Sequence, residues 1–145
     1  MNGKTIKVLY IEDDPEDVEL VKEYLDESID SKFSMLHVNE LSKGIQVLKD
    51  NGIDIVLLDL SLPDCIGLET FKKLRANAPL VPIIVFTGTT LHRAEMRECI
   101  MGSQSFLLKK DLDSNSLIKS ILESIEKRQI QEKLSSHFVD DSKPI

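Results

Sequence analysis

The stretch "DIVLLDLSLPD", residues 54–64, poses the question that decides the fold. An apolar run leads directly into Asp59, and a short loop containing Leu62, Pro63 and Asp64 follows it. A charge at the end of a buried strand is costly unless another group pairs with it. Asp59 therefore either caps a turn or lies at the end of a sheet strand in a reactive site. The other segments of the sequence distinguish these two roles.

Short apolar runs alternate with amphipathic helical patterns along the chain. Dense apolar strands are typical of a parallel sheet that is covered on both faces. The expected strands are residues 7–11, 33–38, 53–59, 81–87 and 105–109. Helices are expected after Asp14-Pro15, over the stripes Leu41–Ile45–Leu48 and Leu68–Phe71–Leu74, over residues 91–101, and from Ser114 through Leu117, Ile121 and Ile125. This order predicts an α/β fold: a doubly wound, five-stranded parallel sheet in the flavodoxin-like order 2-1-3-4-5, with five helices.

Bulk properties narrow the class of protein. The 145 residues suit one domain, which we place at residues 5–130, with a helical extension and C-terminal tail over 131–145. The formal net charge of −7 argues against a nucleic-acid partner. No apolar run approaches the roughly 20 residues that span a bilayer, so we expect a cytoplasmic protein without membrane contact. Cys65 and Cys99 are expected to be reduced and unpaired.

Polar side chains follow four of the expected strands at their carboxyl ends, where open parallel sheets bind ligands. Three carboxylates crowded together favour a hard divalent cation such as Mg²⁺. A lysine ammonium and a threonine hydroxyl can both pair with an anion beside that cation. A carboxylate in such surroundings is a plausible phosphoryl acceptor. The residues concerned are Glu12, Asp13, Asp59, Thr87 and Lys109.

Four pieces of the sequence, in this order, resemble the receiver domain of two-component response regulators, the CheY-like superfamily. They are "VLYIEDD" (8–14), "DIVLLDLSLPD" with Gly67, "PIIVFTG" (82–88) and "SFLLKK" (105–110). The resemblance covers about residues 5–130. It implies a phosphoacceptor signalling module that is not an enzyme in the ordinary sense.

The resemblance also implies a role for individual residues. Asp59 would be phosphorylated by a histidine kinase or a histidine phosphotransfer protein. Lys109 would pair with Asp59 or its phosphoryl group. Mg²⁺ would be held by Glu12, Asp13, Asp59 and the backbone carbonyl of Ser61, with Asp13 the more direct ligand, while Thr87 and Phe106 would switch position. The family commonly has a proline after the lysine, in a cis peptide bond; here it is Lys110, which puts the geometry of that bond in doubt.

Two other functions remain open at this point. One is a phosphohydrolase that works through an aspartyl phosphate, although haloacid-dehalogenase-type enzymes carry a DxD acceptor after the first strand and this chain has "EDDP" there. The other is a receiver-like scaffold that binds partners without phosphorylation. Asp14, directly before Pro15, is expected to be a helix N-cap rather than a metal ligand. Ile130 and Leu134 continue the last helical stripe beyond the sheet, which suggests a weak homodimer or an unknown downstream protein target.

Overall fold

In the computed structural model of this chain, five parallel strands form one sheet in the order β2-β1-β3-β6-β7. Counted along the chain, this is the order 2-1-3-4-5, so the predicted doubly wound, flavodoxin-like sheet is confirmed. The strands are β1 (Thr5–Ile11), β2 (Lys32–Val38), β3 (Ile55–Asp59), β6 (Ile83–Thr87) and β7 (Ser105–Leu108).

The structure describes residues 4–50, 52–87, 97 and 105–142, with side chains for all of these except Thr87 and residues 135–142. Within these ranges there are four α-helices: α1 (Pro15–Asp26), α2 (Leu41–Asp50), α3 (Leu68–Asn77) and α5 (Ser114–Ser142). The helix predicted over residues 91–101 lies outside the described residues, apart from Arg97, and so does Cys99.

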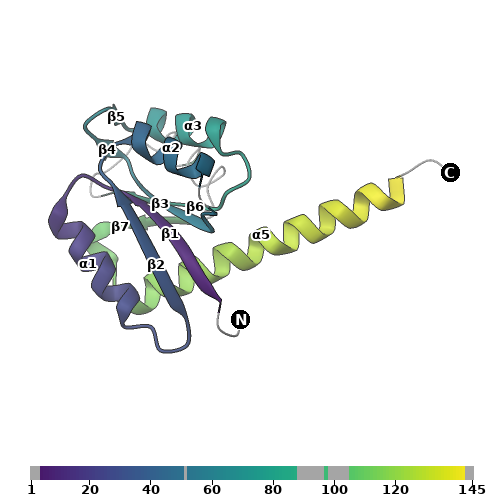
Figure 1. Cartoon of the computed structure of the whole chain (residues 1–145), viewed down its shortest axis with the longest axis horizontal. Helices are drawn as coiled ribbons and strands as arrows, with labels where there is room; N and C mark the ends of the chain where they lie inside the picture. The colour runs from purple at the N-terminus through teal and green to yellow at the C-terminus, as the bar shows by residue number, and fades with distance from the viewer. Residues whose placement is uncertain (1–3, 51, 88–96, 98–104, 143–145) are drawn as a thin grey trace.

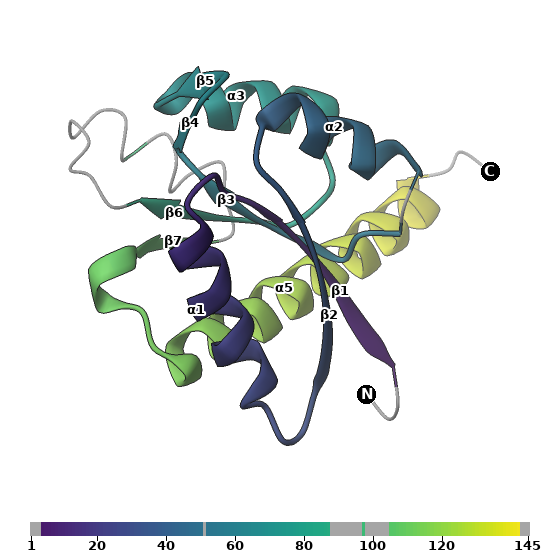
Figure 2. The same ribbon diagram turned by 60° about the vertical axis from the view of Figure 1, so that its left-hand side comes forward.

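The helices cover the two faces of the sheet as separate layers. Figures 1 and 2 show α2 and α3 on one face and α1 and α5 on the other. Residues of β1 alternate between these layers, because successive side chains of a strand point to opposite faces. Leu9 and Ile11 pack with Leu41, Phe71 and Leu74 on the α2–α3 side. Ile6, Val8 and Tyr10 pack with Val21, Leu25, Leu117 and Ile121 on the α1–α5 side.

Local sequence signals place the start of α1 and the end of α3 where they were expected. The carboxylate of Asp14 accepts a hydrogen bond of 2.9 Å from the backbone N–H of Glu16, so Asp14 is the N-cap of α1. The helix α3 ends at Asn77, two residues before Pro79. It begins after Gly67, whose φ of 75° favours glycine.

The connections after β3 and β7 differ from the sequence prediction. A two-stranded antiparallel hairpin, β4 (Ser61–Leu62) and β5 (Cys65–Ile66), replaces the plain loop expected after Asp59. The strand β7 ends at Leu108, and Lys109 opens a short 3-10 turn, η1 (Lys109–Asp111), instead of ending the strand. No cis peptide bond occurs among the described residues, so the Lys109–Lys110 bond is trans.

The hairpin after β3 supplies the N-terminal cap of a helix that precedes it in the sequence. The carboxylate of Asp64 accepts hydrogen bonds from the backbone N–H groups of Leu41 (2.9 Å) and Ser42 (3.1 Å). These two N–H groups open α2 and have no partner within the helix. Asp64 therefore fixes the start of α2 against the loop that follows Asp59.

The last helix extends well beyond the sheet, as Figure 1 shows. Helix α5 runs without a break past the boundary predicted at residue 130 and continues to Ser142, so most of the segment predicted as a helical extension and tail is helical. On this extension Ile130 is 48% exposed and Leu134 is 63% exposed. In the part of the chain that the structure describes, no helix is both long and apolar enough to cross a membrane.

Replacing Asp64 by alanine should lower the free energy of unfolding by about 1 kcal/mol, the usual contribution of an N-cap side chain. Slight burial would raise the pKa of Asp64, but the hydrogen bonds from Leu41 and Ser42 outweigh it and lower this pKa. The cap should therefore contribute fully near neutral pH and be lost as the pH falls through the lowered pKa of the folded state. Urea unfolding of wild type and Asp64→Ala at several pH values measures this.

The matched control for this cap is Asp64→Asn, which keeps an oxygen acceptor and should retain most of the stability at neutral pH. A loss in Asp64→Asn as large as in Asp64→Ala would contradict the capping role.

Candidate functional site

Two buried carboxylates lie side by side at the carboxyl edge of the sheet. Asp59 is the last residue of β3, and Glu12 directly follows β1, the strand that pairs with β3 in parallel. Asp59 is 3% exposed and Glu12 is 1% exposed. Neighbouring parallel strands end at the same edge, which is why residues 47 positions apart in the sequence meet here.

Several hydrogen bonds hold Glu12 in place. One carboxylate oxygen, Oε1, accepts a hydrogen bond of 2.9 Å from the hydroxyl of Tyr10, and Oε2 accepts one of 3.3 Å from the backbone N–H of Asp14. Nε2 of His37 donates to the backbone carbonyl of Glu12 at 2.7 Å. Tyr10 is itself fixed in the core by an edge-to-face contact with Phe86. Two hydrogen bonds thus orient the buried Glu12 carboxylate, and a third fixes the backbone of Glu12.

Lys109 brings the positive charge to this edge. Its Nζ lies 2.8 Å from Oε1 of Glu12, 2.8 Å from Oδ2 of Asp17 and 3.6 Å from Oδ2 of Asp59. Burial by itself would lower the pKa of Lys109, but the hydrogen bonds to Asp17 and Glu12 and the charge of Asp59 raise it above its ordinary value. The ammonium therefore stays charged and partly offsets the cost of burying two carboxylates.

The acidity of Asp59 reflects its surroundings. Burial, a hydrogen bond to Glu12 that only protonated Asp59 can donate, and the charge of Glu12 raise the pKa of Asp59 to about 8. Lys109 and a backbone hydrogen bond from Ser61 act in the opposite direction and do not outweigh these effects. Without a second cation, Asp59 therefore holds a proton more tightly than an ordinary carboxyl group does.

The three predicted carboxylates do come together. Oxygen atoms of Glu12, Asp13 and Asp59 lie within 4.8 Å of one another, close enough to hold one metal ion. Asp13 is exposed whereas the other two are buried, so solvent can reach the cluster at Asp13. The donor set fits a hard divalent cation, because all three groups offer carboxylate oxygens, the ligands that such ions prefer.

The other predicted site residues lie nearby in the fold, but their roles stay predictions. Thr87 ends β6 and pairs with Leu108, while the position of its hydroxyl lies outside the described part of the structure. Phe106 lies in β7 opposite Val85 and packs, half-buried, against the core on the α2–α3 side. Ser61 opens β4, two residues beyond Asp59.

Sequence reasoning missed Asp17, Tyr10 and His37 at this site. Asp17 occupies the first turn of α1, which begins at the same edge of the sheet, but its partner Lys109 lies 92 residues away, so no local pattern could have identified it. Tyr10 carried no signal either, since an aromatic residue inside an apolar strand normally serves the core.

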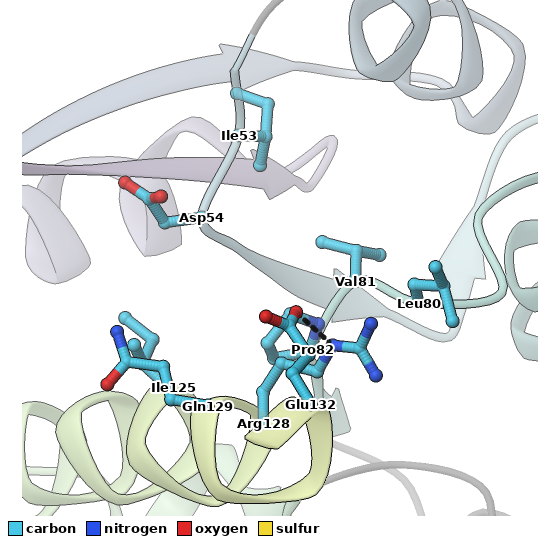
Figure 3. Close-up of a pocket in the computed structure, with 9 residues that line it drawn as sticks. All are labelled: Ile53, Asp54, Leu80, Val81, Pro82, Ile125, Arg128, Gln129 and Glu132. Carbon is cyan, nitrogen blue, oxygen red and sulfur yellow. Dashed lines mark ion pairs between the residues drawn. The ribbon is translucent and has the colours of Figure 1, made fainter. Parts of the chain in front are cut away.

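A separate hollow of about 430 Å³ lies at the opposite edge of the sheet, between α5 and the segments that lead into β3 and β6 (Figure 3). An ion pair of 3.0 Å between Arg128 and Glu132 crosses its wall along α5. The hollow shares no residue with the acidic edge. Its lining consists of Ile53, Asp54, Leu80, Val81, Pro82, Ile125, Arg128, Gln129 and Glu132.

Comparison with known proteins identifies residues 8–122 as a match to the family described as "Response regulator receiver domain". The chain is 32% identical over 104 residues to the transcriptional regulatory protein MalR of Bacillus subtilis, covering 72% of this chain and 44% of MalR. It is 32% identical over 120 residues to the transcriptional regulatory protein CpxR of Klebsiella pneumoniae, covering 80% of this chain and 49% of CpxR. The chain thus spans about half the length of these curated relatives.

Solved structures show the same fold. The signal receiver domain of a putative Luxo repressor protein from Vibrio parahaemolyticus superposes with a TM-score of 0.76 at 21% identity, covering 90% of this chain and 98% of that one. A CheY-like receiver domain protein from Methanospirillum hungatei gives a TM-score of 0.73 at 18% identity, covering 88% and 99%.

The raised pKa of Asp59 predicts an unusual dependence of stability on pH in metal-free buffer. The folded state binds the Asp59 proton more tightly than the unfolded chain, so its stability should fall as the pH rises from about 4 to about 8. Asp59→Asn removes this effect. The free energy of unfolding of Asp59→Asn, relative to that of wild type, should rise by on the order of 2 kcal/mol between about pH 5 and about pH 7, since one pKa unit corresponds to about 1.4 kcal/mol.

Denaturant unfolding in a chelating buffer tests this, with the exposed carboxylate variant Asp50→Asn as the control that should run parallel to wild type. Parallel curves for Asp59→Asn and wild type would mean that Asp59 is ionised throughout.

Proposed function

Because the chain belongs to the response regulator receiver domain family, we propose that Asp59 accepts a phosphoryl group from a histidine kinase or a histidine phosphotransfer protein. The observation that carries the proposal is a nearly buried carboxylate, Asp59, at the end of a central strand, with two further carboxylates and a lysine beside it. The chain is then a signalling module whose only chemistry is the gain and loss of this phosphoryl group.

In this proposal the chain's own residues prepare an in-line displacement. An Asp59 oxygen attacks phosphorus, the P–N bond of the phosphohistidine breaks, and its electron pair stays on the imidazole nitrogen. The backbone N–H of Ser61 and the nearby Lys109 stabilise the ionised form of Asp59 that can attack. The burial of Asp59 keeps bulk water away from the acyl phosphate that results. Positioning and charge neutralisation carry most of the catalysis in phosphoryl transfer.

We propose Mg²⁺ as the cation of the acidic cluster. Glu12, Asp13 and Asp59 would hold it together with the backbone carbonyl of Ser61, with Asp13 the more direct ligand. When bound, the ion supplies positive charge for the phosphoryl oxygens. The preference of Mg²⁺ for carboxylate oxygens and water suits a cluster in which one carboxylate is open to solvent.

The conformational response is proposed to start from Thr87 and Phe106. Thr87 ends the strand beside Asp59, so a hydroxyl there would donate a hydrogen bond to the phosphoryl group. Phe106 is only half-buried, so a change of its rotamer would not require the core to open. Either change alters the surface around β7 and α5, which is where a downstream protein would bind.

The two alternatives are less well supported. A phosphohydrolase of the haloacid-dehalogenase type needs a second aspartate of a DxD motif at the end of the first strand, whereas here Asp14 is engaged as the N-cap of α1. A scaffold without phosphorylation leaves unexplained why Asp59 and Glu12 are buried against Lys109. Both alternatives are distinguished by the labelling experiment below.

The remaining partners stay predictions. The relatives named transcriptional regulators are about twice as long as the matched region, so their activity does not transfer to this chain. The absence of a nucleic-acid partner and the cytoplasmic location are expected from composition and sequence only. A weak homodimer through the extension of α5 is proposed from the exposed side chains of Ile130 and Leu134.

Acetyl phosphate with Mg²⁺ should add one phosphoryl group to wild type and none to Asp59→Asn, which has no carboxylate nucleophile. Intact-mass spectrometry measures the added phosphoryl group. A matched control is Asp54→Asn, a carboxylate at the other end of β3, which should be labelled like wild type. Equal labelling of Asp59→Asn and wild type would remove Asp59 as the acceptor, and rapid turnover of small phosphate esters would favour the phosphohydrolase.

The double variant Ile130→Ser and Leu134→Ser should weaken self-association, because burial of each side chain contributes about 1.5–3 kcal/mol of transfer free energy. Sedimentation with and without acetyl phosphate should show a monomer–dimer equilibrium in wild type that shifts on phosphorylation. Labelling of Asp59 should be unchanged in the variant, which serves as the control for folding. A wild type that stays monomeric under both conditions would show that the extension does not pair with a second copy.

A further inference from the structure

From the contacts of Lys109 we infer that Asp17 is a positioning residue, which holds the Lys109 ammonium aside so that the acidic cluster can accept a divalent cation. The inference rests on the metal site of the proposed function and adds a residue that lies outside that site. Asp17 lies in the first turn of α1 and is not one of the three carboxylates of the cluster, which are Glu12, Asp13 and Asp59.

Lys109 is shared between the cluster and Asp17. Its Nζ is 2.8 Å from Glu12 Oε1 and 3.6 Å from Asp59 Oδ2, and both of these residues belong to the cluster. Its third close anion is Oδ2 of Asp17, also at 2.8 Å. Of the three ion-pair partners of Lys109 among the described residues, Asp17 is the one outside the cluster. A cation bound to the cluster would therefore leave the ion pair between Asp17 and Lys109 in place.

The ammonium and a divalent cation compete for the same carboxylates. Positive charge at Nζ repels a cation on Glu12 and Asp59 and also occupies one of the Glu12 oxygens. With Asp17 present, Lys109 keeps a full ion pair when the cluster is taken by a cation. Without Asp17, the ion-pair partners of Lys109 that remain among the described residues are Glu12 and Asp59, so the ammonium becomes a stronger competitor for them.

The surroundings make this ion pair more than a solvated surface contact. The side chain of Lys109 is 22% exposed and that of Asp17 is 30% exposed, so water screens the pair only in part. Both groups also stand at fixed points of the backbone: Asp17 in the first turn of a capped helix, and Lys109 at the first residue of the η1 turn. A merely stabilising ion pair would affect unfolding but not cation affinity, which separates the two roles.

A double-mutant cycle with Mn²⁺ as the probe tests the inference. Mn²⁺ is a hard cation that prefers oxygen ligands, and electron paramagnetic resonance measures its free concentration directly. Asp17→Asn should weaken Mn²⁺ binding about two- to fivefold in the wild-type background, the range expected for a partly exposed ion pair. In the Lys109→Met background the same change should have no effect, since the competing ammonium is gone. Asp17→Glu, which keeps the charge, should bind Mn²⁺ nearly as wild type does.

Two controls complete the experiment. Glu16→Gln removes a neighbouring exposed charge on α1 that is not paired with Lys109 and should leave Mn²⁺ affinity unchanged. Asp13→Ala removes a ligand of the cluster and should weaken binding in both backgrounds. Thermal unfolding without metal verifies that each variant is folded.

The outcomes separate this inference from the proposed function. If Asp17→Asn weakens Mn²⁺ binding equally in both backgrounds, Asp17 acts as a ligand or as a distant charge. If it weakens Mn²⁺ binding in neither background, Asp17 forms only a structural ion pair. Both results overturn the positioning role. If Asp13→Ala still weakens binding in those cases, the metal site of the proposed function stands. If no variant and not even wild type binds Mn²⁺, the metal site and the positioning role fall together.

Discussion

The ion pairs of one ammonium group, Nζ of Lys109, make the carboxyl edge of this sheet possible. Two carboxylates, Glu12 and Asp59, are almost completely buried side by side, an arrangement that costs several kcal/mol when left unbalanced. Lys109 lies within 4 Å of both, and its positive charge offsets part of their repulsion. One ammonium balances the two buried carboxylates only in part, which fits the divalent cation proposed for this edge.

The rest of the fold keeps these groups in place. Tyr10 reaches from the core to Glu12, so the packing of α1 and α5 against the sheet fixes the orientation of a site carboxylate. On the other face, Asp64 joins the hairpin after Asp59 to the first turn of α2. The α1–α5 layer thus meets Glu12 through the packing of Tyr10, and the α2–α3 layer meets the loop that follows Asp59 through the hydrogen bonds of Asp64.

The sequence predicts the parts of this architecture that depend on local patterns. The apolar runs of β1, β3 and β6 and the Asp14-Pro15 signal appear in the structure near the expected positions, because burial on both faces and helix capping leave a mark within a few residues. The hairpin of β4 and β5 pairs nearby residues, but each strand has only two residues, too few to show an alternating pattern. The cap from Asp64 depends on a contact between segments about 20 residues apart, for which the sequence has no short-range signal. Asp17 is missed for the same reason, since its partner lies 92 residues away.

The length of α5 gives the molecule a lever. Arg128 is the last half-buried residue of the helix before the exposed positions 129–134, and from there to Ser142 an α-helix rises by about 20 Å. A tilt of only about 10° where the helix leaves the sheet would sweep its far end through roughly 3–4 Å. A displacement at the sheet too small to disturb packing thus becomes, at the tip of the helix, as large as the shifts that separate the two states of many switching proteins.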